Sequence, residues 1–415
     1  MKKSLKMMGI AAMVLLFAVS CKKEKQNEGQ GETRTLTFTA GISQGNSKTW
    51  VDGGTLYWSE NDQININGTT FKLIEGADTQ KGTFQAESKT AETYYAVYPA
   101  SNVLEGSAAT VTLADQQPYV NGSFAKDIAP MVAMTDDIEN QLHFTNLCGL
   151  LKLDVTGGEK ESFTVNKIVL QSADPEENLA GKGTVTIAGS GNEKLAITEN
   201  GTKAITLTFA ESQSITFDGN TTHSFVFVLP DGSLKHGFNV DLYYGDKMVS
   251  WFGTTKNMGI ESGAMSVATV SESIEKQDSE LLVTYGPTAL TVTFKPDEDI
   301  QIIDPTDEYY LWLEFATNPN EFDDYSEAKR YNPAKAGSYE RTALYADICE
   351  WLEIEPSTYY YVRVCYETAE KKVYSTRPKA ATVPETPPTP DPFGGNIDEF
   401  GSGSSTGGGS IDPWN

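Results

Sequence analysis

The feature that most constrains the fold is an alternation of apolar and polar residues with a period of two. It is clearest in the segment Thr35–Ile42, where the apolar positions are Leu36, Phe38, Ala40 and Ile42. Because successive side chains of a strand point to opposite faces, this spacing predicts a strand that is buried on one face. Similar segments recur through residues 35–272, separated by turn pairs such as Asn67-Gly68 and Asp231-Gly232. The chain is therefore predicted to be all-β and built from sandwiches.

Residues 1–21 have the order of a secretory signal that ends in a lipid-modified cysteine. Lys2, Lys3 and Lys6 precede a short apolar run, and small residues then lead to Cys21. The run is shorter than the roughly 18 residues that suggest a membrane-spanning helix, so residues 1–20 are predicted to be a lipoprotein signal peptide. Cys21 would become the acylated first residue of the mature protein, holding it to a membrane through more than one acyl chain. The alternatives are a plain signal peptide that happens to end near a cysteine and a signal anchor.

The charge balance and the cysteine count limit the partners and the covalent structure. The chain has 57 acidic and 32 basic residues, a formal net charge of −25. Nucleic acid is therefore not expected as a partner, because phosphate binding requires clustered Lys and Arg. Besides Cys21 there are three cysteines, Cys148, Cys349 and Cys365. Either Cys349 and Cys365 form a disulfide or these cysteines are buried thiols.

Changes in composition divide the chain into segments. Residues 21–34 are predicted to be a polar tether, because they lack the apolar residues that a core needs. We predict β-sandwiches at 35–140, 141–276 and 277–383. The Pro/Gly/Ser-rich residues 384–415 are too poor in apolar residues to fold alone and are predicted to be a disordered tail.

The third segment resembles a fibronectin type III domain. The resemblance is carried by Ile354-Glu-Pro-Ser-Thr-Tyr-Tyr-Tyr-Val-Arg-Val364 and by Leu290-Thr-Val-Thr-Phe294, in which Phe294 stands where the family usually has Trp. It implies a tyrosine corner, in which the Tyr360 hydroxyl bonds to the backbone just upstream. Residues 326–347 fit the family pattern poorly, which indicates an insertion or a short helix.

The first two segments resemble the fimbrillin family. The motifs, in order, are Thr37-Phe-Thr-Ala40, Leu56-Tyr-Trp-Ser-Glu-Asn-Asp-Gln-Ile64, Tyr95-Ala-Val-Tyr-Pro-Ala-Ser101, Phe144-Thr-Asn-Leu-Cys-Gly-Leu-Leu-Lys152 and Val228-Leu-Pro230. The resemblance implies two tandem transthyretin-like β-sandwiches, outer-membrane lipidation and a role in fimbriae or other surface adhesion. It also implies donor-strand exchange between fimbrial subunits, in which an added strand completes an open sheet. The strand with Leu36, Phe38, Ala40 and Ile42 is the candidate for displacement.

Two departures from the family pattern affect the predicted role. Arg34 precedes the apolar strand, so releasing that strand would need a cut in the following loop, for example beside Lys48; ordinary solvated bases are the alternative for both residues. The C-terminal residues 394–415 offer few apolar residues for a donor strand. We therefore expect a fimbrial accessory, anchor or adhesion component at the cell surface, which could bind a host protein or a glycan.

The alternative is a glycan-binding surface lipoprotein of a nutrient-uptake system. A cluster of exposed Trp and Tyr on one face would support it. Tyr359 and Tyr361 are expected opposite Tyr360 on the outer face, where they either contact a sugar or partner or take part in edge pairing.

Catalytic and metal-binding motifs are missing from the sequence. The three histidines, His143, His223 and His236, lie in no His-Glu-x-x-His motif, and no serine lies in Gly-x-Ser-x-Gly. Acidic clusters such as Asp297-Glu-Asp299 lack the spacing of a dedicated calcium loop. We therefore predict no enzyme activity, no metal site and no cofactor.

Overall fold

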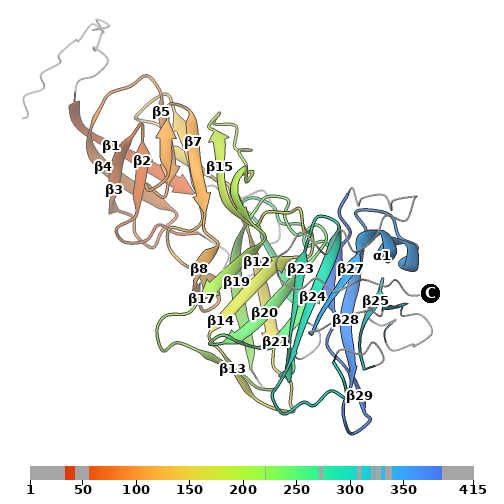
Figure 1. The fold of residues 1–415 in the computed structure, drawn as a ribbon. Helices are drawn as coiled ribbons and strands as arrows, with labels where there is room; N and C mark the ends of the chain where they lie inside the picture. The colour runs from red at the N-terminus through yellow and green to blue at the C-terminus, as the bar shows by residue number, and fades with distance from the viewer. Residues whose placement is uncertain are drawn as a thin grey trace, which may run out of the picture.

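The computed structural model describes residues 33–42, 56–219, 221–270, 274–305, 310–318, 322, 329–331 and 339–385. These residues form strands β1 to β30 and the short helix α1 (Tyr345–Leu352), so the all-β prediction is confirmed (Figure 1). Cys21, Lys48, the predicted signal peptide and the predicted tail from residue 386 lie outside the described residues. Within these ranges no helix has the length and apolar character needed to cross a membrane.

Seven strands close into a barrel at the N-terminal end of the described chain. The strands follow one another around it in the order β1-β11-β10-β5-β2-β3-β4. They are β1 (Thr33–Ile42), β2 (Gln63–Ile66), β3 (Thr69–Glu75), β4 (Lys81–Lys89), β5 (Tyr94–Tyr98), β10 (Met131–Thr135) and β11 (Leu142–Asn146). Alternate side chains fill the interior, and Phe38, Phe71, Phe84 and Phe144 are fully buried there. The sheet of this first unit therefore closes on itself.

The second unit is built from four sheets that enclose their own core. Their strand orders are β19-β12-β22, β21-β20-β14-β17-β8-β9, β16-β15-β7-β6 and β13-β18. The first strands are β6 (Val103–Glu105), β7 (Ala108–Leu113), β8 (Gln116–Val120), β9 (Ser123–Phe124), β12 (Cys148–Thr156), β13 (Phe163–Val165), β14 (Lys167–Ser172) and β15 (Ala180–Thr186). The others are β16 (Glu199–Thr202), β17 (Ala204–Thr208), β18 (Ile215–Phe217), β19 (Thr222–Pro230), β20 (Phe238–Tyr244), β21 (Lys247–Thr254) and β22 (Met265–Thr269).

The boundary between 35–140 and 141–276 does not follow these sheets. Strand β7 pairs with β15 from Ala108↔Thr186 to Leu113↔Gly181, and β8 pairs with β17. Conversely, β11 lies within the predicted second segment but pairs with strands of the barrel. The reason is physical: alternation shows that a segment is a strand, but it does not name the distant strand that completes its hydrogen bonds.

One nearly continuous run, from β11 into β12, joins the barrel to the second unit. Gly149 lies at this junction, and an added Cβ would stand 2.4 Å from the backbone oxygen of Glu261 and 2.8 Å from Ile260. A backbone oxygen cannot move aside as a flexible side chain can. Only glycine therefore fits here without a shift of the loop that covers β12.

The third unit is a two-sheet sandwich. Its sheets have the orders β23-β24-β27 and β26-β25-β28-β29, with β30 also pairing with β28. The strands are β23 (Ser279–Tyr285), β24 (Ala289–Pro296), β25 (Leu311–Ala316), β26 (Lys329–Tyr331), β27 (Glu340–Leu344), β28 (Tyr359–Glu367), β29 (Val373–Ser375) and β30 (Lys379–Thr382). Phe294 is buried, and α1 begins inside the poorly fitting segment 326–347.

The expected tyrosine corner is not formed. Tyr360 is fully buried, and its hydroxyl has no hydrogen-bond partner among the described residues. Its ring points into the core beside Phe315, with a centroid distance of 6.0 Å. Burial raises the pKa of Tyr360 well above its ordinary value, and the neighbouring Tyr285 and Tyr345 raise it further.

The second and third units share a buried interface. Met248 and Trp251 of β21 belong to the hydrophobic core of the third unit. Asn239 of β20 bonds both backbone groups of Ala380, donating at 2.7 Å and accepting at 2.8 Å. Beside it, the ammonium of Lys379 contacts the carboxylate of Asp241, and these side chains are only 1% and 5% exposed. Burial raises the pKa of Asp241 and lowers that of Lys379, while their mutual attraction opposes both shifts.

Lys379→Ala should destabilise the protein strongly, because it leaves the Asp241 carboxylate buried without its partner. We expect a loss of about 3–5 kcal/mol in the free energy of unfolding, measured by denaturant titration. The double variant Lys379→Met/Asp241→Leu should recover most of that loss. Lys295→Ala is the control, because Lys295 is 71% exposed in its pair with Glu280, and its loss should stay below about 1 kcal/mol. Equal effects of Lys379→Ala and Lys295→Ala would contradict this account.

Gly149→Ala should lower the melting temperature, because its methyl group would collide with the Glu261 backbone oxygen. A cost of about 1–3 kcal/mol is expected from overpacking. Gly68→Ala is a comparison in which no atom is struck, since a Cβ at Gly68 meets nothing within 4 Å. Its cost comes from backbone strain alone, because the φ of Gly68 is +85°. Retention of the wild-type melting temperature by Gly149→Ala would show that the loop is not tightly seated.

Candidate functional site

Strand β1 is held unequally on its two sides. On one side it pairs with β4 through nine residues, from Thr33↔Lys89 to Gly41↔Lys81. On the other side it pairs with β11 through only Ala40, Gly41 and Ile42. Within the described chain, the barrel is therefore sealed along β1 by the last three residues of the strand.

The apolar side chains of β1 face the barrel interior, as the alternation predicts. Leu36, Phe38, Ala40 and Ile42 are between 0% and 9% exposed. Phe38 makes edge-to-face contacts with Phe71 at 5.4 Å and with Tyr94 at 4.9 Å. On the outer face, Thr37 accepts a hydrogen bond from the Gln85 side chain at 3.1 Å. Removing β1 would thus uncover an apolar, aromatic-lined groove between β4 and β11.

The two processing candidates differ in what the structure says of them. Arg34 is an exposed residue inside β1, opposite Ser88 of β4, rather than in the segment before the strand. A cut after Arg34 would leave all four buried side chains of β1 in the barrel. Lys48 lies outside the described residues, so a cut beside it stays a prediction.

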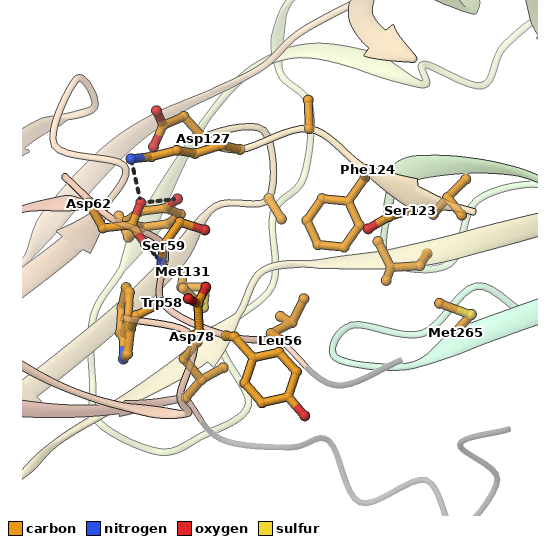
Figure 2. A pocket seen from close by; sticks show the side chains of 18 of the residues that line it. Leu56, Trp58, Ser59, Asp62, Asp78, Ser123, Phe124, Asp127, Met131 and Met265 are labelled. Atoms are coloured by element: carbon orange, nitrogen blue, oxygen red, sulfur yellow. Dashed lines mark hydrogen bonds and ion pairs between the residues drawn. The ribbon is translucent and has the colours of Figure 1, made fainter. Parts of the chain in front are cut away.

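A pocket lies beside the end of β1, between the barrel and the sheet β19-β12-β22. It has a volume of about 300 Å³, and we call it the junction pocket. Its apolar wall includes Ile42, Leu56, Met131, Phe124 and Met265. Figure 2 shows Asp62 and Asp127 on one side of the pocket and Ser123 and Phe124 on the other.

The acidic side of the junction pocket is fixed by hydrogen bonds around Asp62. The Asp62 carboxylate accepts bonds from the Ser59 backbone N–H at 2.6 Å and from the Tyr98 hydroxyl at 3.3 Å. It also pairs with Lys126 at 3.0 Å, which ties the loop after β9 to the barrel. Burial, followed by the charge of Asp62, raises the pKa of Tyr98, so the phenol stays protonated. Trp58 links this corner to β1 by donating a 3.2 Å bond to the Ala40 backbone oxygen.

The remaining predicted residues are not brought together into a reactive site. Cys349 on α1 and Cys365 on β28 are not joined by a disulfide; like the buried Cys148, both are thiols. Burial raises the pKa of Cys148 and Cys349, which disfavours the reactive thiolate. Tyr359 is 44% exposed, but Tyr361 is buried at the interface of the second and third units, with its hydroxyl 3.0 Å from the Thr255 hydroxyl.

Two of the three histidines contact polar groups of neighbouring residues. His236 contacts Asp174 at 2.9 Å, and a ring nitrogen of His223 lies 2.8 Å from the Thr216 backbone oxygen. Among the residues that the structure describes, no three His, Cys, Asp or Glu side chains form a group suited to a metal ion.

Comparisons with known proteins give low similarity throughout. No family model matches the chain, and no curated protein matches it. A Bacteroides ovatus protein provisionally described as a cell adhesion protein aligns with a TM-score of 0.36 and 13% identity, over 59% of this chain and 96% of that one. A similarly described Bacteroides fragilis protein aligns with a TM-score of 0.34 and 10% identity, over 66% and 100%. The FN1–FN3 domains of chicken CNTN1 give 0.17 and 7%, over 79% and 90%. Likeness at this level carries no inference about function.

Phe38→Ala tests whether β1 is an integral part of the barrel core. Removing a fully buried ring should cost about 3–5 kcal/mol of unfolding free energy, measured by denaturant titration. Thr37→Ala, one residue away on the outer face, should change stability by less than about 1 kcal/mol. If both variants were equally stable, β1 would not be seated as the structure has it.

Proposed function

We propose that this chain is an outer-membrane-anchored surface lipoprotein that acts in adhesion, as an accessory, anchor or adhesive component of a fimbrium. Cys21 carries the lipid, and the polar residues between Cys21 and Thr33 connect it to β1. The protein works by binding other molecules rather than by catalysis. This role agrees with the fimbrillin-like motifs, with the lipoprotein signal and with a chain of β-units that follow one tether.

The observation that carries the proposal is the position and pairing of β1. It is the first described strand, it inserts four apolar side chains into the barrel, and it is bonded on the β11 side through three residues only. A strand with these properties can be replaced by an equivalent strand from another subunit, because main-chain bonds supply affinity and alternate side chains fill the same pockets. The partner would be another fimbrial subunit whose strand repeats the apolar spacing of Leu36, Phe38, Ala40 and Ile42.

The glycan-binding lipoprotein of a nutrient-uptake system ranks second. This role predicts a cluster of exposed Trp and Tyr side chains on one face of a domain. Among the described residues, the exposed aromatic side chains are Tyr57, Tyr244 and Tyr359. They lie before β2, on β20 and on β28, so they belong to three different units and form no common platform.

Protease shaving of intact cells, combined with mechanical shearing, tests the proposal. We expect the wild-type protein to disappear from shaved cells and to appear in the sheared fimbrial fraction. The Cys21→Ser variant should be lost from the membrane fraction, because it cannot be acylated. Loss on shaving without any signal in the sheared fraction would favour the nutrient-uptake role, and complete protection from protease would contradict both surface roles.

The N-terminus of the sheared protein reports on processing. An acylated Cys21 is expected for an anchor, whereas a start at Thr35 or Thr49 would show cutting after Arg34 or Lys48. Only the cut after Lys48 separates β1 from the rest of the chain. Intact mass measurement distinguishes these three ends.

A further inference from the structure

A large polar groove lies on the second unit, beside the end of β11. Four segments line its main part: Thr145 and Asn146, residues 190–194, residues 231–235 and residues 257–264. This part has a volume of about 1010 Å³. A second hollow of about 420 Å³ continues from it past Lys194 and Asp231, toward residues 176–178 and 195–197. Because the two hollows share lining residues, they form one elongated depression, which we call the polar groove.

Hydrogen bonds hold the loops of the polar groove in place. Asp231 accepts a bond from the Ser262 backbone N–H at 2.8 Å and pairs with Lys194 at 2.7 Å. The Ser262 hydroxyl in turn donates to the Leu147 backbone oxygen at 3.0 Å. These contacts tie three of the lining loops to β12 and to one another. A groove that is formed before a ligand arrives avoids the entropic cost of ordering its loops on binding.

The chemistry of the lining selects a class of ligand. Asn192, Asn257 and Lys235 are exposed there, together with serine hydroxyls and backbone groups, so both donors and acceptors are present. The central charges, Lys194 and Asp231, neutralise each other, and Glu177 and Glu193 accept hydrogen bonds from the protein itself. The other charged side chains are Lys235, Glu176 and Glu261, so the lining is acidic overall. Among the residues that the structure describes, no Trp, Tyr or Phe lines the groove, and few of the lining side chains are apolar. This lining suits neither an apolar ligand nor an acidic one.

At two glycines of the polar groove, a ligand can come close to the protein backbone. An added Cβ at Gly191 or at Gly259 would meet nothing within 4 Å, so the main chain itself forms the wall at these points. A hydroxyl-bearing sugar ring can therefore approach peptide groups directly, where glycine leaves room for it.

We propose that the polar groove binds a segment of a neutral polysaccharide. Its hydroxyl groups both donate and accept hydrogen bonds, which matches the mixed lining, and its linear form matches a groove that continues across the Lys194–Asp231 pair. The inference deepens the proposed adhesive function by naming its ligand class, and it rests on that function for its biological meaning. Affinity comes from hydrogen bonds without aromatic stacking, so binding at one groove is weak and gains from many copies on a surface.

Native affinity electrophoresis of the purified chain, residues 21–415 with Cys21→Ser, tests the proposal. The gels contain neutral polysaccharides (mannan, arabinoxylan, galactomannan or dextran) or the acidic polygalacturonate and chondroitin sulfate. We expect retardation by at least one neutral polymer and none by the acidic ones. The variant Asn192→Ala/Asn257→Ala should bind about 25-fold more weakly, since each of the two lost hydrogen bonds costs about fivefold.

Controls separate a lost site from a damaged fold. Asn140→Ala replaces an exposed asparagine outside the polar groove and should bind as the wild type does. Asn257→Asp keeps an oxygen that can accept from the Gly259 backbone N–H, a bond of 2.8 Å, while it removes the amide donor; it should lose binding with an unchanged melting temperature. Retardation by none of the neutral polymers, retardation by acidic polymers only, or full binding by the double variant would each overturn the proposal. Because the assay uses purified protein, its failure leaves the shaving experiment untouched, and a periplasmic location would not alter its result.

Discussion

The segment from Leu142 to Thr156 is the constraint on which the rest of the structure depends. Its first part, β11, pairs with β1 and β10 and closes the barrel, and its second part, β12, pairs with β19 and β22 in the second unit. Only Leu147 separates the two strands, and its side chain is fully buried in a core that both units share. A hinge needs residues whose backbone can rotate without disturbing their neighbours. Here both flanking strands are bonded in sheets, so the barrel and the second unit are joined rigidly at this point.

The start of the same segment explains why β1 is held weakly on one side. The pairing is parallel and begins at Ala40↔Leu142, where β11 itself begins, so β11 offers no backbone to the earlier residues of β1. Strand β4 has no such limit, because it runs alongside β1 from Thr33↔Lys89 to Gly41↔Lys81. The junction pocket occupies the region where β11 departs, next to Ile42. Unequal pairing of β1 is thus a consequence of where β11 begins, and strand exchange would use that asymmetry.

Local sequence patterns predicted the strands well and their partners poorly. The alternation of Leu36, Phe38, Ala40 and Ile42 reports directly which side chains are buried, because the period of a strand is a local property. Pairing of β7 with β15 joins residues far apart in sequence, and nothing in either segment encodes the other. For the same reason the sequence could not reveal that Asp241 and Lys379 meet. In the sequence, nothing distinguishes this acid and base from the others, because they meet only where the third unit packs against β20.

The tyrosine corner and the polar groove are two further features that sequence motifs did not predict correctly. The Thr-x-Tyr-x-Val pattern correctly marked Tyr360 as a core residue of β28, but a motif does not fix the direction of a hydroxyl within a core that also contains Tyr285 and Tyr345. The polar groove carried no motif, since its residues come from turns that read individually as ordinary connections. Turn residues such as Asp231 and Gly232 were predicted as turns because they favour that backbone geometry. These loops form a groove only when the fold brings them to the same place, so loops that are ordinary in sequence can together line the surface that we propose as a binding site.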